Sequence, residues 1–304
     1  MSYTLLIGEY AYSDQSMRGW LALDAFGIKF KPNYVPLFSD EHSTKLKEYA
    51  PATSLPILLD DTSKGVPLSW GNAAIIEILA ERYPDAGHWP NELEARSNAQ
   101  VLAARALTGF AALQELPMNL HARYQGHKPS EAEQADIEEL VTLLEWAIDR
   151  SGGPYLFGSD FCAADVAVAP IITRLVTYGF EYTGKVKNYV ETLYAFPALR
   201  RWHACADAQL RRIEIWHKDL PSQSNRQWPR KPTLPAQPYE GDVADAINEF
   251  CPYSGLPISA DSLGSIDGMI VGFCNPFCCR RGMADAESWP TVMSKMGRVP
   301  RETN

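Results

Sequence analysis

The chain changes from an extended to a helical pattern within residues 12–18, which read Tyr-Ser-Asp-Gln-Ser-Met-Arg. The apolar run at residues 3–7 predicts a buried strand, and residues 17–23 predict a helix with an apolar face. A turn of this kind exposes backbone N–H groups and the positive end of the helix dipole, so it can hold an anion. The hydroxyls of Ser13 and Ser16 either cap the helix or take part in chemistry at this turn.

The composition is that of an ordinary globular protein. The chain has 304 residues, 46% hydrophobic and 21% charged, a length that suits about two domains. Its net charge of -9, without a basic block, argues against a nucleic-acid partner. No apolar run approaches the roughly 20 residues of a membrane span, and no secretory signal opens the chain. We therefore expect a cytoplasmic protein with no membrane partner.

Residues 1–83 alternate between strand and helix patterns. An extended stretch at residues 28–35 follows the first helix, and the polar residues 40–49 predict either a short helix or a mobile loop. The order from the first strand is strand-helix-strand, followed by strand-strand-helix. That order is the thioredoxin-like arrangement.

The second half of this segment predicts a hairpin followed by a helix. Strands at residues 53–60 and 66–70 flank a turn at 60–65, and Pro56 stands where its missing N–H group is tolerated. Asn72 is placed to cap the next helix. In the thioredoxin-like fold, this proline is cis and presents the preceding backbone to a peptide ligand.

From residue 88 to residue 216 the pattern is helical throughout. Ser130 and Glu133 have the spacing of a capping box at the start of one helix. Residues 161–165 lead into an apolar helix that runs to about Tyr178, and Pro197 stands in the first turn of the last helix. We expect an all-helical domain.

A thioredoxin-like segment followed by a helical one resembles the glutathione transferases, over about residues 1–215. The resemblance is closest to the serine-type, zeta-like branch, in which Ser-x-x-Ser-x-Arg follows the first strand. It implies a two-fold dimer that uses glutathione, with a thioredoxin-like domain at 1–83 and an all-helical substrate domain at 88–216. The motifs that carry it are Tyr12-Ser13, Ser13 to Arg18, Leu55-Pro56, Trp70 to Glu77 and Cys162 to Asp165.

By position, Ser13 resembles the serine that donates a hydrogen bond to the glutathione sulfur. A free thiol has a pKa of about 8.5, and a hydroxyl donor at a helix N-terminus stabilises the thiolate. Ser16 lies one helical turn away and is the second catalytic candidate. No cysteine precedes Cys162, which argues against a mechanism in which a protein thiol of the first segment attacks.

The resemblance also implies a glutathione-binding set, which is Leu55, Pro56, Gly71, Asn72 and His42. Family members usually carry an acid and a serine where this chain has Gly71 and Asn72, so the amine of glutathione loses its acidic partner here. Backbone N–H groups at that helix start can still bind a carboxylate.

Three arginines are candidates for the substrate pocket, namely Arg18, Arg123 and Arg174. The alternative for Arg18 is an acidic partner, and the alternative for Arg123 and Arg174 is a position on the protein surface. Asp165, at a helix start, is expected to be structural.

The third segment consists of a proline-rich linker at 217–247 and a small module at 248–292. Cys251 opens a knuckle-like turn, Asp267-Gly268 is the centre of a hairpin, and Pro276 stands in the first turn of a short helix. This treble-clef-like layout resembles the small YHS or TRASH-like metal-binding modules.

The candidate metal ligands are Cys251, Cys274 and Cys278. Ser254 occupies the position that would complete a cysteine pair, and Cys279 is adjacent to Cys278, so that both seldom reach one ion. The module either holds zinc with a borrowed ligand or packs on its own apolar residues without metal.

Two classes of function remain open. One is a glutathione transferase that acts on a small electrophile, or a cis-trans isomerase that uses glutathione as a transient nucleophile. The other is a non-catalytic binding protein with the transferase fold. Ser13 and Leu55-Pro56 favour the enzyme, whereas Gly71 and the added cysteine module favour the binding protein.

Overall fold

The computed structural model describes residues 2–60, 62, 66–182, 184–222, 228–229 and 232–298. The chain forms two compact units, one made of residues 1–194 and 212–229 and the other of 195–211 and 230–304. The helical segment that we expected at 88–216 is thus divided between the two units.

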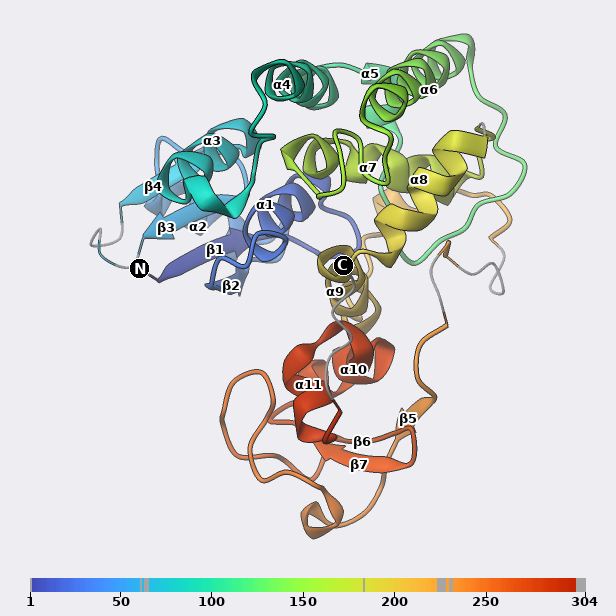
Figure 1. Cartoon of the computed structure of the whole chain (residues 1–304). Helices are drawn as coiled ribbons and strands as arrows, with labels where there is room; N and C mark the ends of the chain where they lie inside the picture. The colour runs from blue at the N-terminus through green and yellow to red at the C-terminus, as the bar shows by residue number, and fades with distance from the viewer. Residues whose placement is uncertain are drawn as a thin grey trace. The chain divides into compact units, whose positions relative to one another are not determined.

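The first unit begins with a four-stranded sheet of order β2-β1-β3-β4 (Figure 1). β1 pairs in parallel with β2 and antiparallel with β3, and β3 pairs antiparallel with β4. This confirms the thioredoxin-like prediction. The elements of this part are β1 (Tyr3–Ile7), α1 (Asp14–Asp24), β2 (Phe30–Tyr34), α2 (Asp40–Glu48), β3 (Ile57–Asp60), β4 (Pro67–Trp70) and α3 (Asn72–Arg82).

The polar stretch at residues 40–49 forms a helix and not a loop, namely α2, in which the side chain of Ser39 accepts a capping hydrogen bond from the N–H group of His42. The expected hairpin turn at 60–65 lies mostly outside the described residues. Leu55-Pro56 is a cis peptide bond, as expected. A Cβ atom at Gly19 would lie 2.7 Å from Cγ of Pro56, so a glycine in α1 is what lets this helix pack against the cis-proline segment.

The rest of the first unit is helical. The central helix of this part, α7, is buried along its whole length and packs against α4 and α1. Ser130 and Glu133 form the expected capping box at the start of α6. The elements are η1 (Pro84–Ala86), α4 (Leu93–Thr108), α5 (Ala111–Glu115), α6 (Glu131–Ser151), α7 (Ala163–Tyr178), α8 (Gly184–Ala195) and η2 (Glu214–Trp216).

Asp165 is structural, as expected. Its carboxylate accepts hydrogen bonds from the N–H groups of Cys162 and Leu156, at 2.9 and 3.3 Å, and from the hydroxyl of Tyr189 at 2.9 Å. Burial raises the pKa of this carboxyl to about 6. Asp165 therefore joins the loop before α7 to α7 and α8.

The second unit contains a three-stranded antiparallel sheet of order β5-β6-β7. The predicted hairpin is confirmed, with Asp267 and Gly268 both at positive φ between β6 and β7. The helix that begins at Pro276 is also confirmed, and it packs against α9. The elements are α9 (Pro197–Ala208), β5 (Ala236–Pro238), η3 (Val243–Asp245), β6 (Leu263–Ile266), β7 (Met269–Gly272), α10 (Pro276–Ala284), η4 (Ala286–Ser288) and α11 (Pro290–Lys295).

β5 lies within the stretch that we expected to be only a linker, and it pairs with β6. A second link inside this unit is the ion pair of Arg200, in α9, with the fully buried Asp285. Its two hydrogen bonds measure 2.8 and 2.7 Å. The C-terminal module is thus built on α9.

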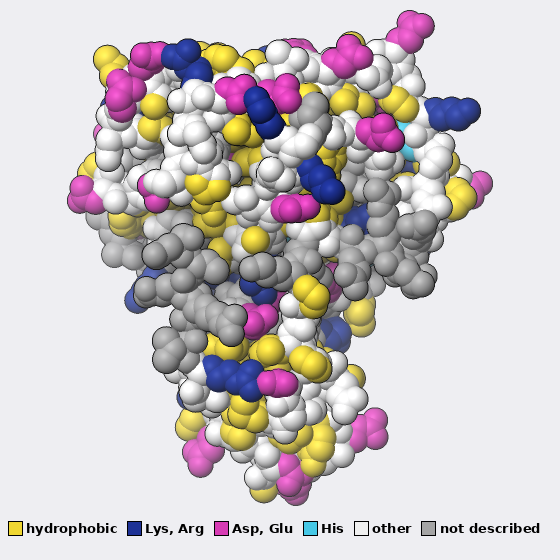
Figure 2. Space-filling model, turned by 45° about the vertical axis from the view of Figure 1, so that its right-hand side comes forward, with side chains coloured by type: hydrophobic (Ala, Val, Ile, Leu, Met, Phe, Trp, Pro, Cys, Tyr) yellow, Lys and Arg dark blue, Asp and Glu magenta, His cyan; other side chains and the backbone are white. Residues whose placement is uncertain are grey.

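Across the described part of the chain, no helix combines the length and hydropathy of a membrane span. On the face shown in Figure 2, acidic and basic side chains are interspersed among the described residues, and they form no continuous basic surface.

Candidate functional site

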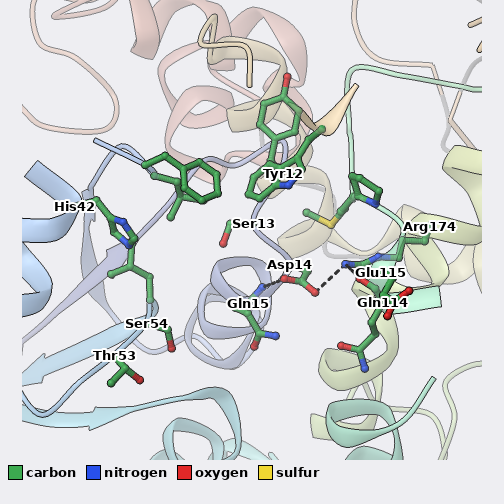
Figure 3. Close-up of a pocket in the computed structure, with 16 residues that line it drawn as sticks. Tyr12, Ser13, Asp14, Gln15, His42, Thr53, Ser54, Gln114, Glu115 and Arg174 are labelled. Carbon is green, nitrogen blue, oxygen red and sulfur yellow. Dashed lines mark hydrogen bonds and ion pairs between the residues drawn. The ribbon is translucent and has the colours of Figure 1, made fainter. Parts of the chain in front are cut away.

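The first unit contains a pocket of about 460 Å³ whose walls come from several separate segments (Figure 3). Of the predicted site residues, Ser13, His42, Leu55 and Arg174 line it. Asp14 and Gln15 line it as well, and the sequence had not marked them as site residues.

Ser13 is the N-cap of α1, and its oxygen accepts a hydrogen bond from the N–H group of Ser16 at 3.2 Å. Its hydroxyl donates to Oγ of Ser16 at 2.7 Å, and Oγ of Ser16 also accepts from the N–H group of Gly8 at 2.9 Å. Ser13 is 7% exposed and lines the pocket, whereas Ser16 is fully buried behind it. Of the two serines that could cap the helix, the structure shows Ser13, which has the extended backbone that an N-cap requires.

Asp14 links α1 to α7 at the pocket wall. Its Oδ2 lies 3.0 Å from Nη2 of Arg174 and 3.6 Å from Nη1 of Arg18. Burial alone would raise the pKa of Asp14, but the charges of Arg174 and Arg18 outweigh burial and hold that pKa below its ordinary value. Asp14, Arg174 and Arg18 together carry one net positive charge, and they lie next to the N-terminus of α1. The positive charge and the helix dipole both favour an anion in the pocket.

Arg174 lines the pocket with its guanidinium fixed by the chain around it. Its Nε donates to the carbonyl oxygen of Leu116 at 2.7 Å, and Nη1 donates to that of Pro170 at 3.3 Å. Arg18, by contrast, is completely buried, and its Nε donates to the carbonyl oxygen of Ala167 at 3.0 Å. Of the two alternatives for Arg18, the structure shows the acidic partner and not the pocket.

Arg123 does not line the pocket either, and it is not a surface residue. It is 4% exposed, its guanidinium lies over the ring of Trp228, and its Nη1 donates to the carbonyl oxygen of Ala122 at 2.7 Å. The structure therefore brings Arg174, but neither Arg18 nor Arg123, to the pocket.

The start of α3 differs from the prediction. Gly71, not Asn72, is the N-cap residue, and its φ of 76° suits glycine. Asn72 is the first residue of the helix, and its side-chain amide donates a hydrogen bond to Oε1 of Gln15. Asn72 cannot cap the helix because its amide is turned toward α1. Its buried Oδ1 has no hydrogen-bond partner in the described part of the chain.

Of the predicted glutathione-binding residues, Leu55 and His42 line the pocket together with Ser13, whereas Pro56, Gly71 and Asn72 do not line it. Leu55 lines the pocket, and Pro56 follows it across the cis bond and packs on Gly19. His42 lines the pocket from α2, and burial lowers the pKa of its ring, so the imidazole is neutral at pH 7.

An aromatic wall at the pocket was missed by the sequence interpretation. The rings of Tyr12 and Phe38 lie 5.7 and 5.3 Å from that of Trp216, and all three residues line the pocket. The hydroxyl of Tyr12 is 2.8 Å from Nε2 of His217. The position of Tyr12 directly before Ser13 could have marked it as a pocket residue. Its contact with Trp216 could not be predicted, because no local sequence pattern connects two residues so far apart in the chain.

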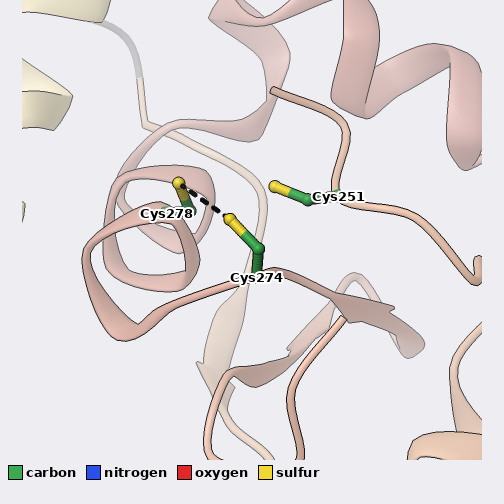
Figure 4. A group of neighbouring side chains, drawn as sticks. All are labelled: Cys251, Cys274 and Cys278. Atoms are coloured by element: carbon green, nitrogen blue, oxygen red, sulfur yellow. Dashed lines mark hydrogen bonds between the residues drawn. The ribbon is translucent and has the colours of Figure 1, made fainter. Parts of the chain in front are cut away.

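The second unit brings the three predicted metal ligands together, and their sulfur atoms point toward one another (Figure 4). The Sγ atoms of Cys251, Cys274 and Cys278 all lie within 4.8 Å of one another, and those of Cys274 and Cys278 are 3.9 Å apart. A hydrogen bond from Cys278, together with backbone N–H groups, lowers the pKa of the Cys251 thiol, and the same contact raises the pKa of the Cys278 thiol. This group has the chemistry of a thiolate ligand set.

Comparison with known proteins connects the fold to one family. Residues 121–205 match the family model described as "Glutathione S-transferase, C-terminal domain". A Caenorhabditis elegans protein named "probable maleylacetoacetate isomerase" is 28% identical to the chain over 200 residues, which are 64% of this chain and 91% of the relative.

Two solved structures show the same likeness. A glutathione transferase homologue from Burkholderia gl BGR1, with bound glutathione, is 28% identical with a TM-score of 0.50, over 66% of this chain and 96% of its own. A diazinon-metabolizing glutathione S-transferase of the silkworm, Bombyx mori, is 20% identical with a TM-score of 0.54, over 71% of this chain and 100% of its own. The chain has the glutathione transferase fold, in which a thioredoxin-like domain precedes a helical domain.

Proposed function

We propose that the chain is a glutathione-dependent enzyme that stabilises the thiolate of glutathione with the hydroxyl of Ser13. The observation that carries the proposal is the position of Ser13, which is at once the N-cap of α1 and part of the pocket wall. The glutathione-bound relative and the probable maleylacetoacetate isomerase, each 28% identical, support it.

The hydrogen bond between Ser13 and Ser16 can reverse its direction, which frees the hydroxyl proton of Ser13 for the sulfur of glutathione. Without glutathione, Ser13 donates to Ser16 at 2.7 Å. When the thiolate arrives, the Ser13 proton turns to the sulfur and the Ser16 hydroxyl donates to Ser13 in its place. Ser16 still accepts from the N–H group of Gly8. One charge-assisted hydrogen bond of roughly 1.5–3 kcal/mol lowers a thiol pKa by about one to two units.

The rest of glutathione is held by the segments on either side of Ser13. The backbone of Leu55, before cis-Pro56, pairs with the peptide of glutathione, and His42 lies at the same wall. The N–H groups at Gly71 and Asn72 receive the γ-glutamyl carboxylate.

The second substrate is a small, flat, anionic electrophile. The rings of Tyr12, Phe38 and Trp216 offer aromatic surfaces, and Arg174 supplies the positive charge of the pocket. The reaction is either transfer of glutathione to this electrophile or a cis-trans isomerisation with glutathione as transient nucleophile.

Three further proposals concern the whole protein. It is a two-fold homodimer, as the resemblance to the transferases implies. It works in the cytoplasm, and its six cysteines, all described, are free thiols. Cys251, Cys274 and Cys278 hold a zinc ion, supported by their convergence within 4.8 Å.

The experiment is a calorimetric titration with glutathione and with S-methylglutathione, followed by thiolate absorbance of the complex. Turnover is then measured with an aryl halide and with a cis-unsaturated keto acid. We expect both peptides to bind and only glutathione to show thiolate absorbance at neutral pH. No binding at millimolar glutathione would contradict the proposal.

A further inference from the structure

We infer that the cysteine group of the second unit holds one divalent, thiophilic cation through three protein thiolates, with a fourth coordination position that takes an exchangeable ligand from solvent. This inference rests on the zinc proposal above and deepens it, because it assigns an open site rather than a closed structural one.

The sulfur atoms already have the spacing that such an ion requires. Thiolates about 2.3 Å from a tetrahedral zinc lie about 3.8 Å apart. The Sγ atoms of Cys274 and Cys278 are 3.9 Å apart, and Cys251 lies within 4.8 Å of both. A shift of at most about one ångström at Cys251 completes the three-ligand geometry.

Each sulfur comes from a different and separately fixed segment. Cys251 opens a turn in which its carbonyl oxygen accepts from the N–H group of Gly255 at 3.0 Å. Cys274 follows the end of β7. Cys278 lies in the first turn of α10, where its N–H group donates to the N-cap Asn275 at 2.9 Å. A strand end, a turn and a helix start thus hold the three thiols before any ion binds.

No other histidine, cysteine or carboxylate of the described residues joins this group. Cys279 is turned away, since its Sγ lies 3.5 Å from where a Cβ of Gly264 would be, on β6. Two exposed polar groups donate to Sγ of Cys274, the hydroxyl of Ser254 at 3.2 Å and Nδ2 of Asn275 at 3.3 Å. Cys274 is also the least buried of the three cysteines, so the open side faces solvent.

The charges around the group favour a divalent ion. Nη2 of Arg281 lies 3.5 Å from Sγ of Cys278, and its guanidinium is placed over the rings of Tyr253 and Trp289, 3.7 and 5.0 Å from their centroids. Three thiolates and one guanidinium leave two negative charges, which one divalent cation neutralises. The fourth ligand is then a neutral molecule, such as water.

Structural zinc sites use four protein ligands, whereas sites with three protein ligands and a water keep a position for exchange. Ser254 stands where a fourth cysteine would close this site. Cys279 provides a matched control, because it is a buried thiol one residue from a ligand and outside the group.

The test uses the full chain, purified with a reductant that is not a thiol and loaded with Co²⁺ as a coloured substitute for zinc. We expect one ion per chain and an intense sulfur-to-cobalt band, which 2-mercaptoethanol shifts and strengthens as it becomes the fourth ligand. Ser254→Cys should show the strengthened band without added thiol and should no longer respond to it. Cys274→Ser should lose the band, and Cys279→Ser should keep it.

The outcomes separate the two proposals. A wild-type chain without metal, whose spectrum matches that of Cys274→Ser, overturns both the zinc proposal and the open site. One bound ion whose band ignores the added thiol, with Ser254→Cys unchanged, keeps the zinc proposal and overturns the open position. Arg281→Gln should lower zinc affinity about ten-fold, as loss of a group that supports a ligand does, and Arg281→Lys should restore part of it.

Discussion

The carboxylate of Asp14 lies 3.0 Å from the guanidinium of Arg174, although 160 residues separate them along the chain. The contact joins the first turn of α1, in the thioredoxin-like domain, to α7, the central helix of the helical domain. It holds a carboxylate in a pocket that we propose receives a thiolate, and it neutralises that carboxylate with Arg174 and Arg18.

Asp14→Asn should destabilise the protein by about 2 kcal/mol at pH 7, since two buried arginines lose their shared partner. The folded-state pKa of Asp14 is depressed, so its contribution is present above the unfolded pKa of about 3.9 and is lost as the pH falls through the folded value. Urea unfolding of both proteins at several pH values measures this. A stability difference that does not shrink between pH 5 and pH 2 would contradict it.

Ser13→Ala should raise the pKa of bound glutathione by about one to two units. It should also lower the free energy of unfolding by about 1 kcal/mol, because Ser13 is the N-cap of α1. Ultraviolet difference titration of the thiolate, together with urea unfolding, measures the two effects. An unchanged thiolate pKa removes Ser13 from the mechanism.

Ser16→Ala is the matched comparison. It leaves the N–H group of Gly8 without its acceptor, at a cost of about 1–3 kcal/mol in unfolding free energy. We expect a smaller shift in the thiolate pKa than in Ser13→Ala, because the Ser13 hydroxyl remains. A larger shift would assign the sulfur contact to Ser16.

Local patterns were enough to predict the order of elements in the first 83 residues. The alternation of apolar residues and the proline directly before β3 depend on neighbours in sequence, and so does the capping box of α6 in the helical segment. The contacts that complete the pocket do not. Asn72 turns to Gln15 instead of capping α3, and Trp216, about 200 residues later in the chain, contacts Tyr12. Such pairings depend on packing between distant elements, which periodicity does not encode.

Gly19→Ala should destabilise the first unit by about 1–3 kcal/mol, because its Cβ would lie 2.7 Å from Pro56. It should also weaken glutathione binding, since the cis-proline segment forms one wall of the pocket. The control is Gly184→Ala at the start of α8, where nothing lies within 4 Å. This change should be neutral or slightly stabilising. Equal effects of the two substitutions on urea unfolding would show that the close approach of Gly19 to Pro56 does not contribute to stability.

Arg200→Met should cost about 3 kcal/mol in the second unit, because it leaves the fully buried Asp285 without its cation. Hydrogen exchange should accelerate in α9, α10 and η4, while β1 and β3 keep their protection. Lys185→Met, which breaks an exposed pair with Asp149, should change stability by less than about 1 kcal/mol. Unchanged exchange in α10 would contradict the role of Arg200.

The chain passes from one compact unit to the other after Tyr194, after Arg211 and after Pro229, so the units are interleaved along the sequence. No single cut can release them as two complete parts. A protein shortened to residue 229 would keep α9 but lose α10, and the apolar side of α9 would face water. The C-terminal module is therefore not an independent domain. Proteolytic removal of this module would expose the apolar side of α9 and leave a protein that tends to aggregate.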